Sequence, residues 1–150
     1  RLAGVETMCK IQINRHINVH GAYNYLYTSK DADGVRLSSS SPHSGNIRAE
    51  YNTRIPRYAT VVNLSGNIMG KKKFDVLDEL EIDGKKVEAY YQAKVNPYCL
   101  WDLTVSQYIM QNLRITAGIT NLFDYTSDRV TFNTSTSPGR NYFIACNYTL

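Results

Sequence analysis

Residues 17–27, INVHGAYNYLY, alternate between two kinds of side chain. Ile17, Val19 and three tyrosines fall on the odd positions, whereas polar residues such as Asn18 and His20 fall on most of the even positions. Successive side chains of a β-strand point to opposite faces of the sheet, so a period of two indicates a strand. The stretch therefore predicts a β-strand with one uncharged face and one polar face.

The same period recurs along the chain and predicts an all-β, antiparallel fold. In residues 5–13, for example, Val5 and Ile11 share one parity, and Glu6 and Lys10 share the other. No segment shows a helical pattern of comparable strength. Seven strands are expected, near residues 4–13, 17–28, 44–53, 58–69, 87–109, 113–122 and 140–150.

The predicted connections are short and long in turn. Residues 14–16, 53–57 and 110–112 form tight links, while residues 29–43, 70–98 and 124–140 form long ones. All short links then lie at one end of an up-and-down sheet. Outer-membrane barrels have this asymmetry, with short periplasmic turns and longer extracellular loops.

The 70–98 connection is expected to contain a hairpin of its own. Asp83-Gly84 suits a tight turn between residues 79–82 and 85–91. The parity of residues 87–95 continues into Trp101, so we expect one strand over 87–109 that is interrupted at Pro97.

The composition fits the wall of a membrane barrel. The 150 residues include twelve Tyr, four Phe and one Trp, with a mean hydropathy of -0.37. A transmembrane helix needs about 20 consecutive apolar residues, which are absent here, whereas barrel strands alternate and average to a polar value. Interfacial aromatic belts are predicted from Tyr25, Tyr27, Trp101 and Tyr142 at the extracellular side and from Tyr51 and Tyr148 at the periplasmic side.

Alternation does not decide whether the uncharged face meets lipid or a protein core. The alternative is a soluble β-sandwich or small-barrel ligand-binding module. An autonomous small outer-membrane barrel is disfavoured, because bacterial barrels use an even number of strands and need about eight to close. We therefore expect a partial transmembrane β-barrel, a piece of a larger one.

Other function classes find little support. The net charge is only +4, and the basic run at residues 71–73 is followed closely by acids, so no nucleic-acid partner is expected. Glu50 and Asp102 are lone carboxylates on the polar parity and are expected to pair with Arg48 or Arg114 instead of acting in acid-base catalysis.

No enzyme, cofactor or metal site is expected either. No G-x-S-x-G motif occurs, and no metal-ligand role is expected for His16, His20 or His43. Cysteines Cys9, Cys99 and Cys146 are odd in number, lack paired spacing and fall on the uncharged parity, so no disulfide framework is indicated.

The last third of the chain resembles the C-terminal end of TonB-dependent receptors. The family has an apolar-Asp-Leu strand start, an Asn-Leu-Phe-Asp strand end and a Pro-Gly-Arg before the final strand. Here these are Trp101-Asp102-Leu103, Asn121-Leu122-Phe123-Asp124 and Pro138-Gly139-Arg140. Residues 21–26 and Pro42-His43-Ser44 resemble the strand and the Pro-x-His segment that precede them.

The resemblance implies a barrel of about 22 strands in the outer membrane of a Gram-negative bacterium. Such receptors import iron-siderophore complexes, haem, cobalamin or glycans with energy from TonB. The implied partners are the rest of the barrel, a plug domain that this sequence lacks, the TonB complex through a missing N-terminal part, outer-membrane lipid and the barrel assembly machinery.

Two further sets of residues follow from the resemblance. The final strand fits the terminal assembly signal of the family, with Tyr142, Ile144, Tyr148 and Leu150 alternating to the end, although the family usually ends in Phe or Trp. Substrate contacts are expected from the long connections, with Tyr90, Tyr91 and Arg129 as candidates.

Overall fold

The computed structural model describes residues 2–28, 41–82, 85–110, 112–126 and 139–149, and of residues 73–93 the backbone alone. No helix among these residues is long and apolar enough to cross a membrane. The elements are the β-strands β1 (Leu2–Gln12), β2 (Ile17–Thr28), β3 (His43–Asn52), β4 (Thr60–Met69), β5 (Lys72–Ile82), β6 (Lys85–Val95), β7 (Tyr98–Ile109), β8 (Leu113–Thr120) and β9 (Asn141–Tyr148).

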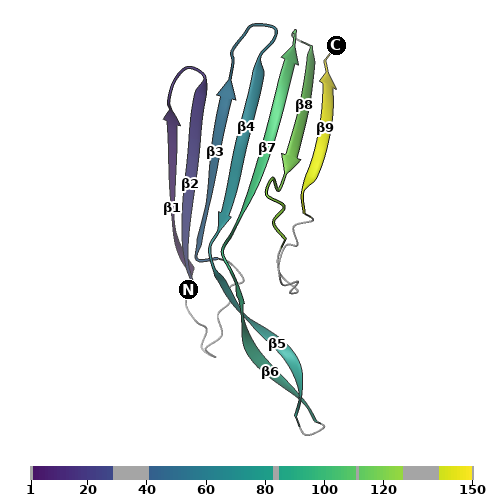
Figure 1. Cartoon of the computed structure of the whole chain (residues 1–150). Helices are drawn as coiled ribbons and strands as arrows, with labels where there is room; N and C mark the ends of the chain where they lie inside the picture. Colours follow the sequence, from purple (N-terminus) through teal and green to yellow (C-terminus); the bar gives the residue numbers. More distant parts are fainter. Residues whose placement is uncertain (1, 29–40, 83–84, 111, 127–138, 150) are drawn as a thin grey trace.

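Seven of the strands form one antiparallel sheet in the order β1-β2-β3-β4-β7-β8-β9 (Figure 1). Strands β5 and β6 pair with each other in a separate two-stranded ribbon. Every strand of the sheet therefore lies beside its neighbours in the chain, apart from the step from β4 to β7, which contains the ribbon. The seven-stranded, up-and-down sheet predicted from the alternation is confirmed.

The strand predicted over residues 87–109 is two separate strands, and the interruption predicted at Pro97 is confirmed. Strand β6 ends at Val95 and β7 begins at Tyr98, with Pro97 between them. Proline has no N–H to give to a ladder, so a strand interior is interrupted there. Strand β6 instead pairs along its whole length with β5, from Lys72 opposite Val95 to Ile82 opposite Lys85. The expected hairpin is confirmed with longer strands, and its turn residues 83–84 lie outside the described residues.

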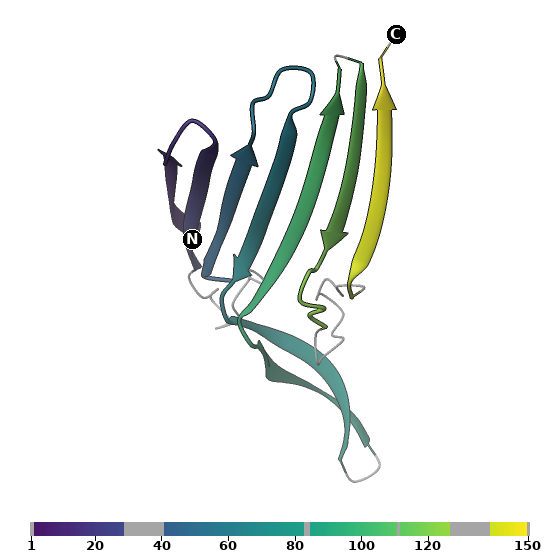
Figure 2. The ribbon, with the colours of Figure 1, turned by 45° about the horizontal axis from the view of Figure 1, so that its top comes forward.

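The two ends of the sheet differ as predicted. The short connections between β1 and β2, β3 and β4, and β7 and β8 all lie at one end, at the top of Figure 1, which we call the short-turn end. The long connections lie at the opposite, long-connection end. The ribbon also extends beyond the sheet there, as a second orientation shows (Figure 2).

The turns at the short-turn end are held by local hydrogen bonds. The Asn14 side-chain oxygen accepts hydrogen bonds from the backbone N–H groups of His16 and Ile17, at 2.8 and 2.9 Å. The Asn52 side-chain oxygen accepts one from the Arg54 N–H at 2.8 Å. Asparagine commonly stabilises turns in this way.

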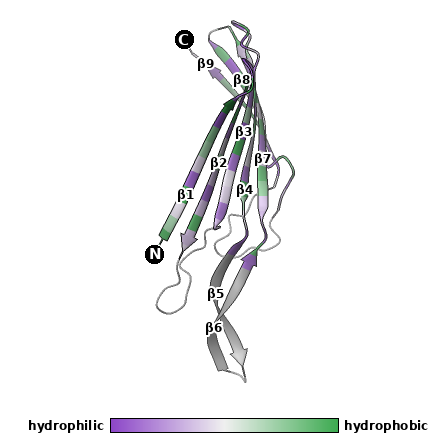
Figure 3. Ribbon diagram, turned by 90° about the vertical axis from the view of Figure 1, so that its left-hand side faces the viewer, coloured by the Kyte–Doolittle hydropathy of each residue, from purple (hydrophilic) through white to green (hydrophobic). Residues whose placement is uncertain are grey.

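The strand register brings the uncharged positions of all seven strands onto one face, which we call the outer face. One continuous row across the sheet consists of Ile11, Val19, Ala49, Leu64, Leu103, Ile119 and Tyr142. A neighbouring row on the opposite, polar face consists of Gln12, Asn18, Glu50, Asn63, Thr104, Gly118 and Phe143. The alternation is visible along the strands in Figure 3.

The sheet has no hydrophobic core of its own. Val95 is the one buried apolar residue among those described, and Ile11, Tyr51 and Ile144 on the outer face are 53%, 45% and 77% exposed. The accessible surface is 11134 Å², against about 7,800 Å² for a compact monomer of this mass. Soluble monomers rarely expose an apolar face of this extent to water.

The described residues do not form the β-sandwich or closed small barrel of the soluble alternative. Within the described residues no second sheet covers the outer face, and the edge strands β1 and β9 do not pair with each other. The outer face instead has the composition of a surface that contacts lipid.

Two glycines make room for aromatic rings, one on each face. A Cβ atom added to Gly66 would lie 2.9 Å from the Trp101 ring on the outer face, and one added to Gly118 would overlap the Phe143 ring on the polar face. Each ring therefore lies flat against the neighbouring strand, an arrangement that compensates for glycine in a sheet.

Candidate functional site

Arg48 is the centre of the polar contacts near the middle of the polar face. Its guanidinium donates from Nε and from one terminal nitrogen to the Asn63 side-chain oxygen, at 3.2 and 3.0 Å. It also lies 3.8 Å from the Glu50 carboxylate, as predicted. Because both side chains are partly exposed, solvent screens the pair, and we expect it to contribute at most about 1 kcal/mol.

Charged side chains of both signs are spread over the polar face. Lys10, His20 and Arg48 occupy successive positions of one row, which continues through Ser65 to Asp102. Glu6, Glu50 and Arg114 lie on the same face in other rows. Such a face is suited to line an aqueous channel and unsuited to contact hydrocarbon.

A hollow of about 640 Å³ lies on the polar face near the long-connection end. Among its lining residues are Glu6, Asn24 and Ser44, which are neighbours in one cross-strand row. Lys72, at the base of the ribbon, adds a cation to the same lining. The alternation placed Glu6 and Asn24 on this face, but only the register brings them into one concave surface with Lys72.

Asp102 does not pair with Arg114, contrary to expectation. The side-chain oxygen of Asp102 accepts a hydrogen bond from the backbone N–H of Asn121 at 2.9 Å. Arg114 lies opposite Tyr108, six residues further along β7, which corresponds to about 20 Å along the strand. Its guanidinium carbon lies 5.9 Å from the centre of the Tyr108 ring.

Asn121 closes the turn that follows β8. It is 5% exposed and has a left-handed φ of 52°, a conformation that asparagine tolerates better than most residues. Its side chain donates to the Tyr125 carbonyl and accepts from the Tyr125 N–H, both at 2.8 Å. The Tyr125 ring in turn stacks on that of Tyr98, with centroids 5.1 Å apart.

Asp124 links this turn to the start of β9. Its side-chain oxygen accepts a hydrogen bond from the backbone N–H of Arg140 at 2.7 Å, next to Gly139, which has a φ of 80°. A side-chain hydrogen bond with Tyr142 raises the pKa of the Arg140 guanidinium, which stays charged. We call Asp102, Asn121, Asp124, Tyr125 and Arg140 the rim cluster.

The rim cluster brings together the motifs that the sequence presents separately. The Leu122 N–H donates to the Trp101 carbonyl at 2.6 Å, so the strand-start and strand-end motifs are joined through the backbone as well. The Phe123 side chain is 69% exposed, and Pro138 lies outside the described residues. Tyr98 and Tyr125 take part in these contacts although no motif marked them in the sequence.

Two of the three predicted substrate-contact residues lie on the ribbon, and the prediction for all three stays untested. Tyr90 and Tyr91 lie on β6, opposite Leu77 and Val76 of β5. As adjacent strand residues they belong to opposite faces of the ribbon. Arg129 lies outside the described residues.

The final strand forms one edge of the sheet. Tyr142, Ile144 and Tyr148 lie on the outer face and are 69%, 77% and 65% exposed. Leu150, the fourth residue of the predicted assembly signal, lies outside the described residues. Among the described residues, strand β9 pairs with β8 alone.

The histidines and cysteines of the described part of the chain are spread over the sheet. No group of three His, Cys, Asp or Glu there could hold a metal ion. His16, His20 and His43 lie respectively at the short-turn end, on the polar face and at the long-connection end. Cys9, Cys99 and Cys146 are free thiols on the outer face.

Comparison with protein families identifies this two-faced sheet. Residues 1–122 match the family described as "TonB dependent receptor-like, beta-barrel". The chain belongs to this family. The uncharged face and the long connections are therefore those of an outer-membrane β-barrel wall, with the long-connection end outside the cell.

Solved structures with the same arrangement include a mutant of the ferric enterobactin receptor PfeA of Pseudomonas aeruginosa, with a TM-score of 0.76 and 18% identity. The ferripyoverdine receptor of the same organism, bound to ferripyoverdine, gives 0.74 and 18%, and the siderophore receptor PirA of Acinetobacter baumannii gives 0.75 and 18%. Each alignment covers 98% of this chain and 22%, 19% and 22% of those chains, respectively. The chain thus spans about a fifth of their length. No curated protein matches it.

Proposed function

We propose that the receptor to which this wall belongs binds a ferric siderophore on the extracellular side and imports it with energy from TonB. The observation that carries the proposal is the family match over residues 1–122, on a sheet with one lipid-type face and one polar face. The siderophore class is supported by the ligands named for PfeA, the ferripyoverdine receptor and PirA.

In this proposal the chain supplies wall strands and extracellular connections. The polar face borders the lumen, and a plug domain and further strands complete the receptor. A segment outside these residues engages TonB, and the barrel assembly machinery recognises the final strand through Tyr142, Ile144, Tyr148 and Leu150.

Ligand contacts are proposed at two places near the long-connection end. One is the hollow on the polar face, where Glu6, Asn24 and Lys72 offer a carboxylate, an amide and an ammonium group to a polar solute. The other consists of the connections that contain Tyr90, Tyr91 and Arg129. Both are on the side from which a nutrient arrives.

We further propose that the rim cluster holds the extracellular ends of β7, β8 and β9 at a fixed spacing. Asp102 bonds to the end of β8, and Asp124 bonds to the residue before β9. These contacts join neighbouring strands, which suits a structural role.

Uptake by the full-length receptor tests the proposed function. A strain that expresses it as the only outer-membrane receptor for iron would be supplied with radiolabelled ferric enterobactin and ferric pyoverdine, and in parallel with haem, cobalamin and an oligosaccharide. We expect uptake of a ferric siderophore, and loss of that uptake in an otherwise identical strain without TonB.

A matched pair of variants locates the contact surface. Lys72→Gln changes the hollow, whereas Arg114→Gln changes a cation of the same face near the short-turn end. We expect a lower apparent affinity for the siderophore with Lys72→Gln alone. Uptake of cobalamin or glycan without any siderophore would contradict the substrate class, and uptake that persists without TonB would contradict the mechanism.

A further inference from the structure

His43 is the single His, Lys, Arg, Asp or Glu on the outer face of the seven described strands of the sheet. It is the first residue of β3, at the long-connection end, and lies directly opposite Tyr25 of β2. Because the outer face otherwise contains no charged residue, an imidazole there calls for a physical explanation.

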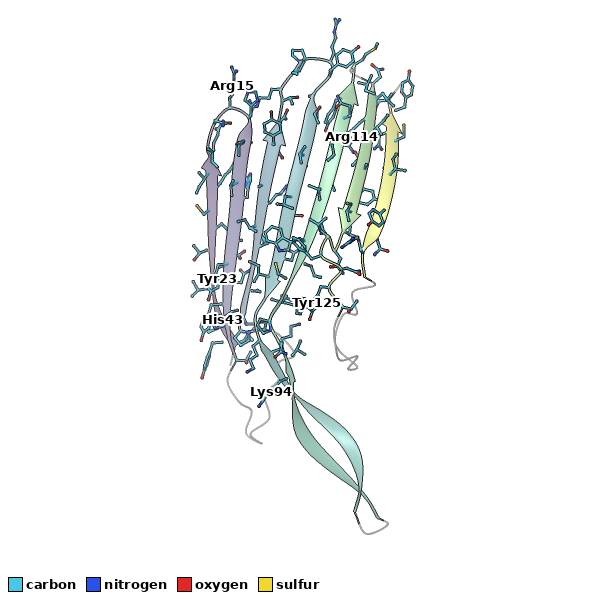
Figure 4. The ribbon with its side chains drawn as sticks, viewed as in Figure 1. Arg15, Tyr23, His43, Lys94, Arg114 and Tyr125 are labelled. Atoms are coloured by element: carbon cyan, nitrogen blue, oxygen red, sulfur yellow. The ribbon has the colours of Figure 1, made fainter. Side chains whose placement is uncertain are left out.

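Two tyrosines fix the orientation of the His43 ring. The Tyr23 hydroxyl lies 2.7 Å from His43 Nδ1, and the ring centroids of Tyr23 and Tyr25 lie 6.2 and 5.1 Å from that of His43. Tyr23 reaches His43 diagonally across the strand pair, past Gly45, which has no side chain there. Tyr23 and His43 lie together near the long-connection end in Figure 4.

The hydrogen bond to Tyr23 leaves the second ring nitrogen available. When the Tyr23 hydroxyl donates to Nδ1, the ring proton is on Nε2, which is then a donor. Among the described residues, neither His43 Nε2 nor the Tyr25 hydroxyl has a hydrogen-bond partner. His43 is exposed, and Tyr25 is 38% exposed.

His16, at the opposite end of the sheet, shows the contrast. It also lies beside an outer-face tyrosine, with its ring 6.2 Å from that of Tyr51. However, its Nδ1 lies 2.8 Å from the Asn52 carbonyl, and its Nε2 accepts a hydrogen bond from Arg15 Nε at 2.9 Å. Both nitrogens of His16 have partners within the protein, whereas Nε2 of His43 has none among the described residues.

We propose that His43, with Tyr25 beside it and Tyr23 as a positioning residue, binds the phosphate group of a lipid headgroup in the outer leaflet. The Nε2–H and the Tyr25 hydroxyl are donors at the level where strand ends meet the headgroups. A phosphate is anionic, accepts several hydrogen bonds and gives stronger ones than a neutral acceptor. This proposal requires the outer-membrane location of the wall but does not depend on the imported ligand.

The test uses the full-length receptor in nanodiscs of phosphatidylcholine that contain either bisphosphorylated or dephosphorylated lipid A. Native mass spectrometry counts the lipid A molecules retained per receptor over a range of lipid A content. We expect the bisphosphorylated form to be retained preferentially. His43→Phe, which keeps a ring but removes the donor, should weaken this retention roughly tenfold, about the effect of one charge-assisted hydrogen bond.

Three controls complete the design. His43→Gln restores an N–H donor and should recover part of the retention, and His16→Phe, the matched variant at the opposite end, should leave it unchanged. The folded fraction of each variant is checked by its heat-dependent mobility in detergent gels. Inorganic phosphate at about 10 mM is added to parallel samples, to distinguish a lipid site from a free-phosphate site.

Each outcome decides the proposal. Equal retention of both lipid forms, or unchanged retention in folded His43→Phe, would overturn it. Displacement of the lipid by inorganic phosphate would show a free-phosphate site and would also overturn it. Siderophore uptake that persists in His43→Phe agrees with the proposal, because the headgroup site and import are separate.

Discussion

The two ends of the sheet are stabilised in different ways. At the short-turn end, an asparagine such as Asn14 bonds to backbone groups two and three residues away, in an exposed turn. At the long-connection end, Asn121 is 5% exposed and joins contacts that connect three strands and residues up to nineteen positions apart. Side chains also bridge neighbouring strands at the short-turn end, as His16 does with the Asn52 carbonyl at 2.8 Å and Asn112 with the Thr149 carbonyl at 2.9 Å. The two ends therefore differ chiefly in the burial of the asparagine that closes the turn.

The largest expected effect comes from Asn121→Ala at the long-connection end. The Tyr125 N–H and carbonyl lose their partner in a buried place, and alanine is disfavoured at a φ of 52°. We expect the free energy of unfolding of the full-length receptor to fall by about 3 kcal/mol, measured by urea titration in lipid vesicles. A loss no larger than that of Asn14→Ala would contradict the contrast between the ends.

Asp102→Ala should have the second largest effect. It leaves the Asn121 backbone N–H without its acceptor, and we expect a loss of about 2 kcal/mol. Asp102→Asn keeps an oxygen acceptor and should lose less. Hydrogen exchange of the Asn121 amide provides an independent measurement. If this amide exchanges equally slowly in wild type and Asp102→Ala, the bond has no role in holding the rim.

The stack between Tyr98 and Tyr125 is expected to contribute less. A double-mutant cycle with Tyr98→Leu and Tyr125→Leu isolates the pair from the effect of each substitution alone. We expect a coupling of about 1 kcal/mol in the free energy of unfolding, given ring centroids 5.1 Å apart. Additive losses would show that the rings contribute independently.

The smallest effect is expected at the short-turn end. In Asn14→Ala, water can replace the side-chain oxygen because the turn is exposed, so the loss should stay below about 1 kcal/mol. Faster hydrogen exchange should be confined to residues 14–17. A loss above about 2 kcal/mol, or faster exchange across β2 and β3, would show that this end is also held cooperatively.

The wall of the barrel could be predicted from the sequence because its environment imposes a period of two. Each strand lies between lipid and water, so residues such as Ile47 and Arg48 must alternate, and a slip of one residue would place a charge in lipid. The same reasoning placed Tyr25, Tyr51, Tyr142 and Tyr148 near the ends of their strands. Short and long connections followed from the gaps between strands.

Pairing and side-chain contacts could not be predicted in the same way. The shared parity of Val95 and Trp101 indicated one strand interrupted at Pro97, but parity gives no information about which strand is the partner. Asp102 was assigned to the correct face, yet its partner is a backbone N–H in a left-handed turn, which has no signature in the side-chain pattern. The lining of the hollow similarly depends on a register that joins Glu6, Asn24 and Ser44.

The insertion of the β5–β6 ribbon between two directly paired strands has a consequence for how this family can change. Met69 and Tyr98 lie opposite each other, so the two ends of the inserted segment are only about 5 Å apart. Loop-closure entropy grows only with the logarithm of length, so exchanging a long insertion for a short one changes stability little. Residues 70–97 can therefore be exchanged as a unit, in evolution or by design. The exchange changes the extracellular surface of the receptor, while the strands of the wall keep their backbone hydrogen bonds.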